Sequence, residues 1–196
     1  MPTLPKRKLG KRIGGASEGD VYLSGQDVTK MLHPKLSQGV NRNVSIAEQK
    51  MRFYSHKIGH LLFPHHVLDV HSVVTRPSGI FISSKFRPGV RVPPKYLPEA
   101  HRVHTTLLDA GISCDAGSKE PNYVLSGGKI LFYEVTSLEP NKVLKHLESR
   151  SDLDQHKRER IKFLLLQYRR NWKDYCEQAR KRWEAKSLER MERTKR

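Results

Sequence analysis

Cysteines, acidic residues and long apolar runs are scarce in this sequence of 196 residues. Cys114 and Cys176 are its only cysteines, which excludes a small disulfide-stapled scaffold, so we expect a cytoplasmic protein in a reducing compartment. No apolar run approaches the roughly 18 residues that span a bilayer, and residues 1–8 lack the apolar region of a secretory signal. The chain contains 20 acidic residues against 37 lysines and arginines, so its net charge is +17 at pH 7. Such an excess favours polyanionic partners such as nucleic acid, nucleotides, acidic proteins or anionic lipid.

Positive charge is concentrated at both ends of the chain. Residues 1–12 hold five basic residues and no acidic one, and residues 151–196 hold fifteen basic and eight acidic residues. Apolar residues keep helical spacing from Ile161 to Trp183, which predicts a long helix, or two helices with a kink, with a core-facing stripe. This spacing assigns Trp172 and Trp183 to the core and not to a surface that stacks bases. The cationic face of the same segment is a candidate surface for RNA or another polyanion; the alternative is a face that only aids solubility.

A β-hairpin is predicted in the second half of the chain. Tyr123-Val-Leu is one short strand, Ser126-Gly-Gly-Lys129 is the turn, and the apolar residues that follow form the return strand. Since antiparallel strands lie side by side, Asn122 and Glu134 at their open ends come together, with Asp115 nearby. Amide and carboxylate oxygens of this kind suit Mg²⁺ held against a phosphate.

These residues resemble the catalytic loop and metal-binding hairpin of the protein-kinase-like fold. That family has an aspartate, four residues, an asparagine, two short strands and then Asp-Phe-Gly. Here six residues separate Asp115 from Asn122, no His-Arg precedes Asp115, and Glu134-Val-Thr stands in place of Asp-Phe-Gly. The resemblance implies that Asp115 is catalytic and orients or accepts the proton of the attacking hydroxyl. It also implies that Asn122 and Glu134 bind Mg²⁺.

The N-terminal region resembles another part of the same fold, its glycine-rich loop. The positions that match the family pattern are occupied by Gly14, Ala16, Gly19 and Val21, with Ala16 in place of a glycine. This loop is similar to that of small atypical kinases such as the RIO group. The resemblance implies that Gly14, Gly15, Gly19 and Val21 belong to an ATP site in which backbone N–H groups cover the phosphates.

A strand with Lys30 at its centre follows the loop, and a capping box from Ser45 to Glu48 then opens a helix. The resemblance implies that Lys30 pairs with the phosphates as a catalytic residue and that Glu48 orients it. The alternatives are that Lys30 only faces solvent and that Glu48 only caps its helix.

Five histidines between residues 56 and 71 suggest a metal site at first sight. His56 and His60 lie one helical turn apart, as zinc ligands can, but no cysteine or glutamate-rich partner shares their spacing. Surface and loop histidines are therefore the preferred interpretation. Cys114, next to Asp115, is either a reactive thiol or a space-filling residue, and we prefer the latter.

A proline-rich segment divides the chain. Four prolines between Pro88 and Pro98 exclude a helix or an inner strand there. The elements before it follow the order β-β-β-α-β-β, and a short helix after it leads to Asp115. We therefore expect a basic arm, an N-lobe, a hinge, a C-lobe and a basic tail, at residues 1–9, 10–86, 87–98, 99–185 and 186–196.

The sequence thus predicts an α+β chain with a minimal two-lobed protein-kinase-like fold, a β-rich N-lobe and a mainly helical C-lobe. The function that the resemblance implies is ATP- and Mg²⁺-dependent phosphotransfer to an unknown substrate. A catalytically inactive, nucleotide-binding pseudokinase is one alternative, and the departures around Asp115 favour it. A basic nucleic-acid-binding protein that uses no ATP is the other alternative, and the net charge favours it.

Overall fold

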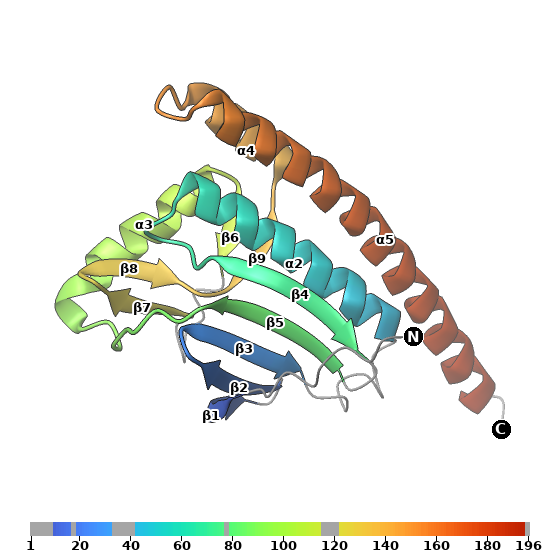
Figure 1. Ribbon diagram of the computed structural model, residues 1–196. Coiled ribbons are helices and arrows are strands. Elements are labelled where there is room, and N and C mark those ends of the chain that lie inside the picture. The colour runs from blue at the N-terminus through green and yellow to red at the C-terminus, as the bar shows by residue number, and fades with distance from the viewer. Residues whose placement is uncertain (1–9, 17–18, 33–41, 77–78, 115–121, 195–196) are drawn as a thin grey trace, which may run out of the picture.

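The computed structural model describes residues 10–16, 19–32, 42–76, 79–114 and 122–194. Its N-terminal part is a β-sheet with one long helix, and its C-terminal part is mainly helical, with short strands between the two (Figure 1). The predicted order β-β-β-α-β-β of the N-terminal part is confirmed. Within the described ranges, no helix combines the length and the apolar character that crossing a bilayer requires.

The N-terminal sheet has five strands, and every neighbouring pair is antiparallel. Gly25 has a φ of 61°, so it makes the tight turn that joins the second and third strands. After the third strand the chain forms a helix and re-enters the sheet at its far edge as the fourth strand. The fifth strand then lies between the third and the fourth. The order in space is β1-β2-β3-β5-β4, and the bounds are β1 Lys11–Ala16, β2 Gly19–Ser24, β3 Asp27–Leu32, β4 Val70–Arg76 and β5 Gly79–Lys85.

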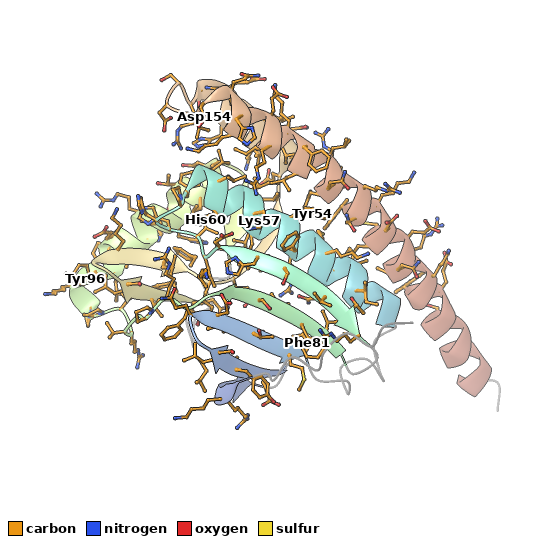
Figure 2. The ribbon with its side chains drawn as sticks, in the orientation of Figure 1. Tyr54, Lys57, His60, Phe81, Tyr96 and Asp154 are labelled. Atoms are coloured by element: carbon orange, nitrogen blue, oxygen red, sulfur yellow. The ribbon has the colours of Figure 1, made fainter. Side chains whose placement is uncertain are left out.

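The helix between β3 and β4 is α2, Arg42–Leu62. It begins three residues before Ser45, so the prediction that Ser45 opens the helix is wrong; a capping pattern within a helix does not fix the helix start. Met51, Ile58 and Leu62 are buried on one stripe of α2, as helical spacing requires. Figure 2 shows Tyr54, Lys57 and His60 in succession along the same helix.

The C-terminal part begins inside the predicted linker, because η1 Pro94–Tyr96 and the first residues of α3 lie within it. The prediction that the prolines between Pro88 and Pro98 exclude a helix there is therefore wrong, since proline is tolerated in the first turn of a helix. Two short antiparallel pairs, β6 with β9 and β7 with β8, lie between its helices. Backbone hydrogen bonds between Val90 and Leu125, at 3.0 Å in both directions, attach the linker to β7. The elements are η1 Pro94–Tyr96, α3 Leu97–Asp109, β6 Ile112–Cys114, β7 Tyr123–Ser126, β8 Lys129–Phe132, β9 Val135–Leu138, α4 Pro140–Ser149 and α5 Gln155–Thr194.

The apolar core lies where α2 meets these C-terminal elements. Phe132 on β8 is fully buried, and side chains from α2, α3, β6, α4 and α5 surround the same cluster. Among the described residues, the five-stranded sheet contributes none to this cluster, and α2 supplies most of the residues that the N-terminal part adds to it. Its largest fully buried members are Phe132, Ile58, Leu62, Leu107, Ile112, Ile130, Leu147 and Ile161.

Helix α5 is a single element of 40 residues, and Figure 1 shows it running alongside α2 and continuing past its end. Its first half is buried at Ile161, Leu165 and Tyr168, but Trp172 is 43% exposed and Trp183 is 70% exposed. The prediction that the apolar stripe stays in the core as far as Trp183 is therefore wrong, because α5 continues beyond the elements that cover its first half. The helix also continues to Thr194, through most of the segment expected as a frayed tail.

Two glycines with positive φ give a test of this arrangement. Gly111 has a φ of 78°, and a Cβ there would lie 2.8 Å from the carbonyl oxygen of Glu139. Gly127 has a φ of 56° and open space around it. Gly127→Ala should destabilise the protein by about 1 kcal/mol through backbone strain alone, whereas Gly111→Ala adds a backbone clash and should cost clearly more. Urea unfolding measures both; equal losses would contradict the packing of β6 against α4.

Candidate functional site

The β7–β8 hairpin has the geometry that the sequence predicts. Tyr123 pairs with Phe132 and Ser126 pairs with Lys129 across it, and the two turn glycines have φ values of 56° and 76°. Beyond the last pair, the Tyr133 N–H donates to the carbonyl oxygen of Asn122 at 3.1 Å. Asn122 and Glu134 therefore flank the same open end of the hairpin, as expected.

Arg52 of α2 connects the helix to this end of the hairpin. Its guanidinium donates to Oε1 of Glu134 at 2.6 Å and to Oε1 of Glu48 at 2.7 Å. The three side chains are about one quarter exposed, so solvent screens these charge-assisted bonds only in part. Sequence reasoning missed Arg52, although its spacing of four residues from Glu48 is the spacing of a helical ion pair.

His56, one further turn along α2, makes a second connection. Its Nε2 accepts the backbone N–H of Val135, the residue after Glu134, at 3.0 Å. The imidazole is only 7% exposed, and burial lowers the pKa of His56 from 6.5 to about 4, with the charge of Arg52 acting in the same direction. His56 is thus a neutral, buried hydrogen-bond acceptor at pH 7, and its interpretation as a surface histidine is wrong.

Two other histidines of the segment bond to the backbone. Nδ1 of His60 lies 2.8 Å from the carbonyl oxygen of Val67, and Nδ1 of His66 lies 2.8 Å from that of Ile130. No group of three or more histidine, cysteine or carboxylate side chains capable of holding a metal is found in the part of the chain that the structure describes. The spacing of His56 and His60 therefore reflects packing and backbone contacts.

Lys30 lies at the centre of the five-stranded sheet. Its neighbours across the ladder are Val21 on β2 and Ile82 on β5. Glu48, the residue expected to orient it, is bound by Arg52. The structure thus places Lys30 on the strand that the sequence predicts, and the carboxylate of Glu48 has a cation from its own helix as its partner.

The predicted glycine loop is the connection between β1 and β2. Gly14 pairs with Val21 and Gly15 pairs with Asp20, while Gly19 begins β2 and faces Ala16. The glycines that the sequence singles out therefore lie at the closed end of one β-hairpin. Their roles in an ATP site remain predictions.

Asp115, the expected catalytic residue, lies outside the described residues, but the strand that precedes it in the chain, β6, is described. Cys114 ends β6 and is paired with Val135 at the start of β9, so the chain leaves β6 next to the residue that follows Glu134. Cys114 is buried, and burial raises the pKa of its thiol to about 12. The thiol therefore stays protonated, which supports a packing role for it.

Comparison with known proteins gives a partial structural likeness. No family model matches the sequence, and no curated protein matches it. The chain is similar to the PknI kinase domain of Mycobacterium tuberculosis, with 18% identity and a TM-score of 0.47 over 66% of this chain and 58% of that chain. A double mutant of that domain gives 18% identity and a TM-score of 0.49 over 74% and 66% of the two chains. These likenesses concern the course of the backbone and assign neither an activity nor a subfamily; the chain spans about three fifths of the length of PknI domains.

The buried His56 predicts a pH dependence of stability. Since its pKa is lowered on folding, the unfolded chain binds a proton between pH 6.5 and about 4 that the folded chain excludes. Its contribution is complete above pH 6.5 and falls by up to about 3 kcal/mol as the pH drops to about 4. His56→Gln keeps an acceptor for the Val135 N–H without titrating in this range, so its unfolding free energy should depend less on pH. The exposed His101, changed to Gln, is the control; equal pH slopes in both variants would contradict the burial of His56.

Proposed function

We propose that this protein is a kinase-like protein that binds ATP with Mg²⁺ and acts as a phosphotransferase. The observation that carries the proposal is the position of Glu134. This residue flanks the open end of the β7–β8 hairpin beside Asn122 and is bound to α2, the helix that follows the strand of Lys30. A kinase-like fold uses the same order of parts: glycine loop, lysine strand, glutamate helix and metal-binding hairpin.

The parts of the chain take different roles in this proposal. Backbone N–H groups of the connection from Gly14 to Gly19 cover the phosphates, and the ammonium group of Lys30 pairs with them. Asp115 orients the attacking hydroxyl and accepts its proton. Because phosphoryl transfer is driven mainly by positioning and charge neutralisation, these residues need to hold their groups in place and need no covalent intermediate.

The donor atoms at the hairpin end fit Mg²⁺. Asn122 and Glu134 offer an amide oxygen and a carboxylate, and Mg²⁺ prefers oxygen ligands and is usually held by one or two protein groups together with phosphates and water. When bound there, Mg²⁺ would neutralise charge on the phosphates. The Arg52 guanidinium now binds Oε1 of Glu134, so Arg52 has to share or release that carboxylate when a metal binds.

The same bond favours a second candidate function, a nucleotide-binding pseudokinase. A guanidinium at Glu134 already supplies positive charge where the resemblance expects the metal, and Glu48 is held by Arg52 as well. In a pseudokinase this arrangement is permanent, and nucleotide binds without metal. The residues around Asp115 also depart from the family pattern, which agrees with this alternative.

Two finer assignments belong to the same proposal. The glycine loop of β1 and β2 is similar to that of the RIO group of atypical kinases, so we assign the protein to the small atypical kinases. Cys114 and Cys176 are both free thiols, which agrees with a reducing compartment, and we propose the cytoplasm.

Nucleotide binding is tested by thermal shift. ATP with Mg²⁺ at about one hundred times its dissociation constant should stabilise the fold by about 2.7 kcal/mol, an increase of several degrees in a chain of this size. Lys30→Ala should reduce the increase, whereas Lys129→Ala, an exposed lysine at the hairpin turn, should leave it unchanged. The absence of any shift in the wild type at saturating ATP would refute the nucleotide site.

The effect of Mg²⁺ on ATP binding distinguishes the enzyme from the pseudokinase. In the enzyme, ATP with Mg²⁺ should shift the melting temperature more than ATP alone, and Glu134→Gln should remove the difference. Asp115→Asn should lower ATP turnover at least a hundredfold, as loss of a general base does, with binding retained; Asp109→Asn, an exposed change at the end of α3, is the control. A wild type that binds ATP equally with and without Mg²⁺ and shows no turnover is a pseudokinase.

A further inference from the structure

Both tryptophans of the protein lie on helix α5, and both are exposed. Trp172 and Trp183 are eleven residues apart, about three helical turns, so they share one edge of the helix at a separation of about 16 Å. Tryptophan is highly buried on average. Two exposed indole rings on one edge therefore indicate a surface that meets a ligand as well as water.

Trp172 is held in place by aromatic neighbours on α5. Its ring stacks with that of Tyr168, with 6.3 Å between the ring centroids, and lies 5.8 Å from that of Tyr175. Tyr168 is itself fixed, because its hydroxyl accepts the N–H of Leu138 at 3.0 Å and donates to the Leu138 carbonyl at 3.2 Å. A ring immobilised in this way loses little entropy when a planar ligand stacks on it.

The acidic residues of this part of α5 face α2. Asp174 and Glu177 line a hollow of about 220 Å³ between the two helices, and Lys50 of α2 lines it from the other side. Glu177 also forms an ion pair with Lys181 of α5 at 2.8 Å. The hydrogen bond from Lys181 lowers the pKa of Glu177, and the charges of Arg180 and Lys173 act in the same direction, so cations of α5 itself offset this carboxylate.

Cations of α5 lie beside the tryptophans. Arg169, Lys173 and Arg180 are exposed and follow helical spacing beside Trp172 and Trp183. Arg169 donates to Asn141 Oδ1 at 3.1 Å, and Arg180 lies 3.8 Å from Glu184. Exposed contacts of this kind are weak, so a phosphate can replace them at little cost.

We propose that this edge of α5, formed by Arg169, Trp172, Lys173, Arg180 and Trp183, binds single-stranded RNA. Exposed aromatic rings interleaved with cations are what a single strand requires, since bases stack on the rings and the cations contact the phosphates. RNA is the expected strand because its sequence-specific and loop contacts are made by unpaired bases. This surface is independent of the proposed nucleotide site.

The test uses the tryptophans as reporters. A uridine oligonucleotide of about 12 nucleotides, within the range of single-strand site sizes, is titrated into the full chain without ATP, and intrinsic fluorescence is measured. Bases that stack on the indole rings should quench the emission. Trp172→Phe leaves Trp183 as the single reporter and keeps an aromatic ring beside Tyr168, and Trp183→Ala leaves Trp172 as the reporter. Trp183→Ala should weaken binding about tenfold, as the loss of one stacked base predicts.

Matched variants separate this edge from the rest of the surface. Phe163→Ala removes an exposed aromatic ring from the opposite side of α5 and should leave affinity unchanged. Replacing Arg169, Lys173 and Arg180 together by Gln should lower the slope of log affinity against log salt by about 2. The same change at Lys95, Arg102 and Lys129, near α3 and the hairpin, should leave this slope unchanged. Lys30→Ala should also retain RNA binding.

Four results would overturn the proposal. The first is that saturating oligonucleotide in low salt does not quench the emission, and the second is that Phe163→Ala and Trp183→Ala lose affinity equally. The third is that the two triple variants change the salt slope equally, and the fourth is that a double-stranded RNA of the same length binds equally well. Vesicles of anionic lipid that quench both tryptophans when the oligonucleotide does not would assign the edge to a membrane surface instead. Circular dichroism confirms that each variant is folded, which is expected because the altered side chains are exposed or conservatively replaced.

Discussion

The bond from Arg52 to Glu134 is the interaction on which the candidate site depends. It joins α2 to the point where the β7–β8 hairpin ends and β9 begins. His56 repeats the connection one turn later by accepting the Val135 N–H. Because β9 also pairs with the end of β6 at Cys114, α2 is connected through β9 to the strand that precedes Asp115 in the chain.

This connection has a consequence for the chemistry of the site. A guanidinium and a metal ion compete for the same carboxylate, because both are cations that bind its oxygens. Arg52 also holds Glu48, the residue on which the orientation of Lys30 depends in the kinase-like fold. In the proposed function, Arg52 would link the proposed metal ligand Glu134 to Glu48, and a change in the bonding of Arg52 would affect both residues together.

Helix α5 meets the rest of the molecule on one side only. Ile161, Leu165 and Tyr168 bury its first half in the core, and Asp174 and Glu177 line the hollow shared with α2. Cations and both tryptophans remain on the outer edge. Glu177 and Glu184 pair with Lys181 and Arg180 on the same helix. The positive character of this surface therefore comes from the excess of cations along α5.

The sequence by itself determined the local structure of this protein. Gly25, Gly127 and Gly128 specify tight turns because only glycine adopts their positive φ at little energetic cost, and the short apolar runs beside them predicted the strands of the hairpins. It also placed Asn122 and Glu134 at one hairpin end, since that follows from strand pairing alone. The catalytic and ligand-binding roles of these residues are still predictions.

Only the tertiary structure decided which distant groups meet. Arg52 and Glu134 are far apart in the chain, and no local pattern encodes their contact; the burial of His56 likewise depends on the segment that covers α2. Helical spacing could not distinguish a buried Tyr168 from an exposed Trp183 on the same stripe, because periodicity records which residues share a face and not how far the covering elements extend. The point along α5 at which its side chains become exposed depends on how far α2 and the strands extend beside it, and that is decided only when the chain folds.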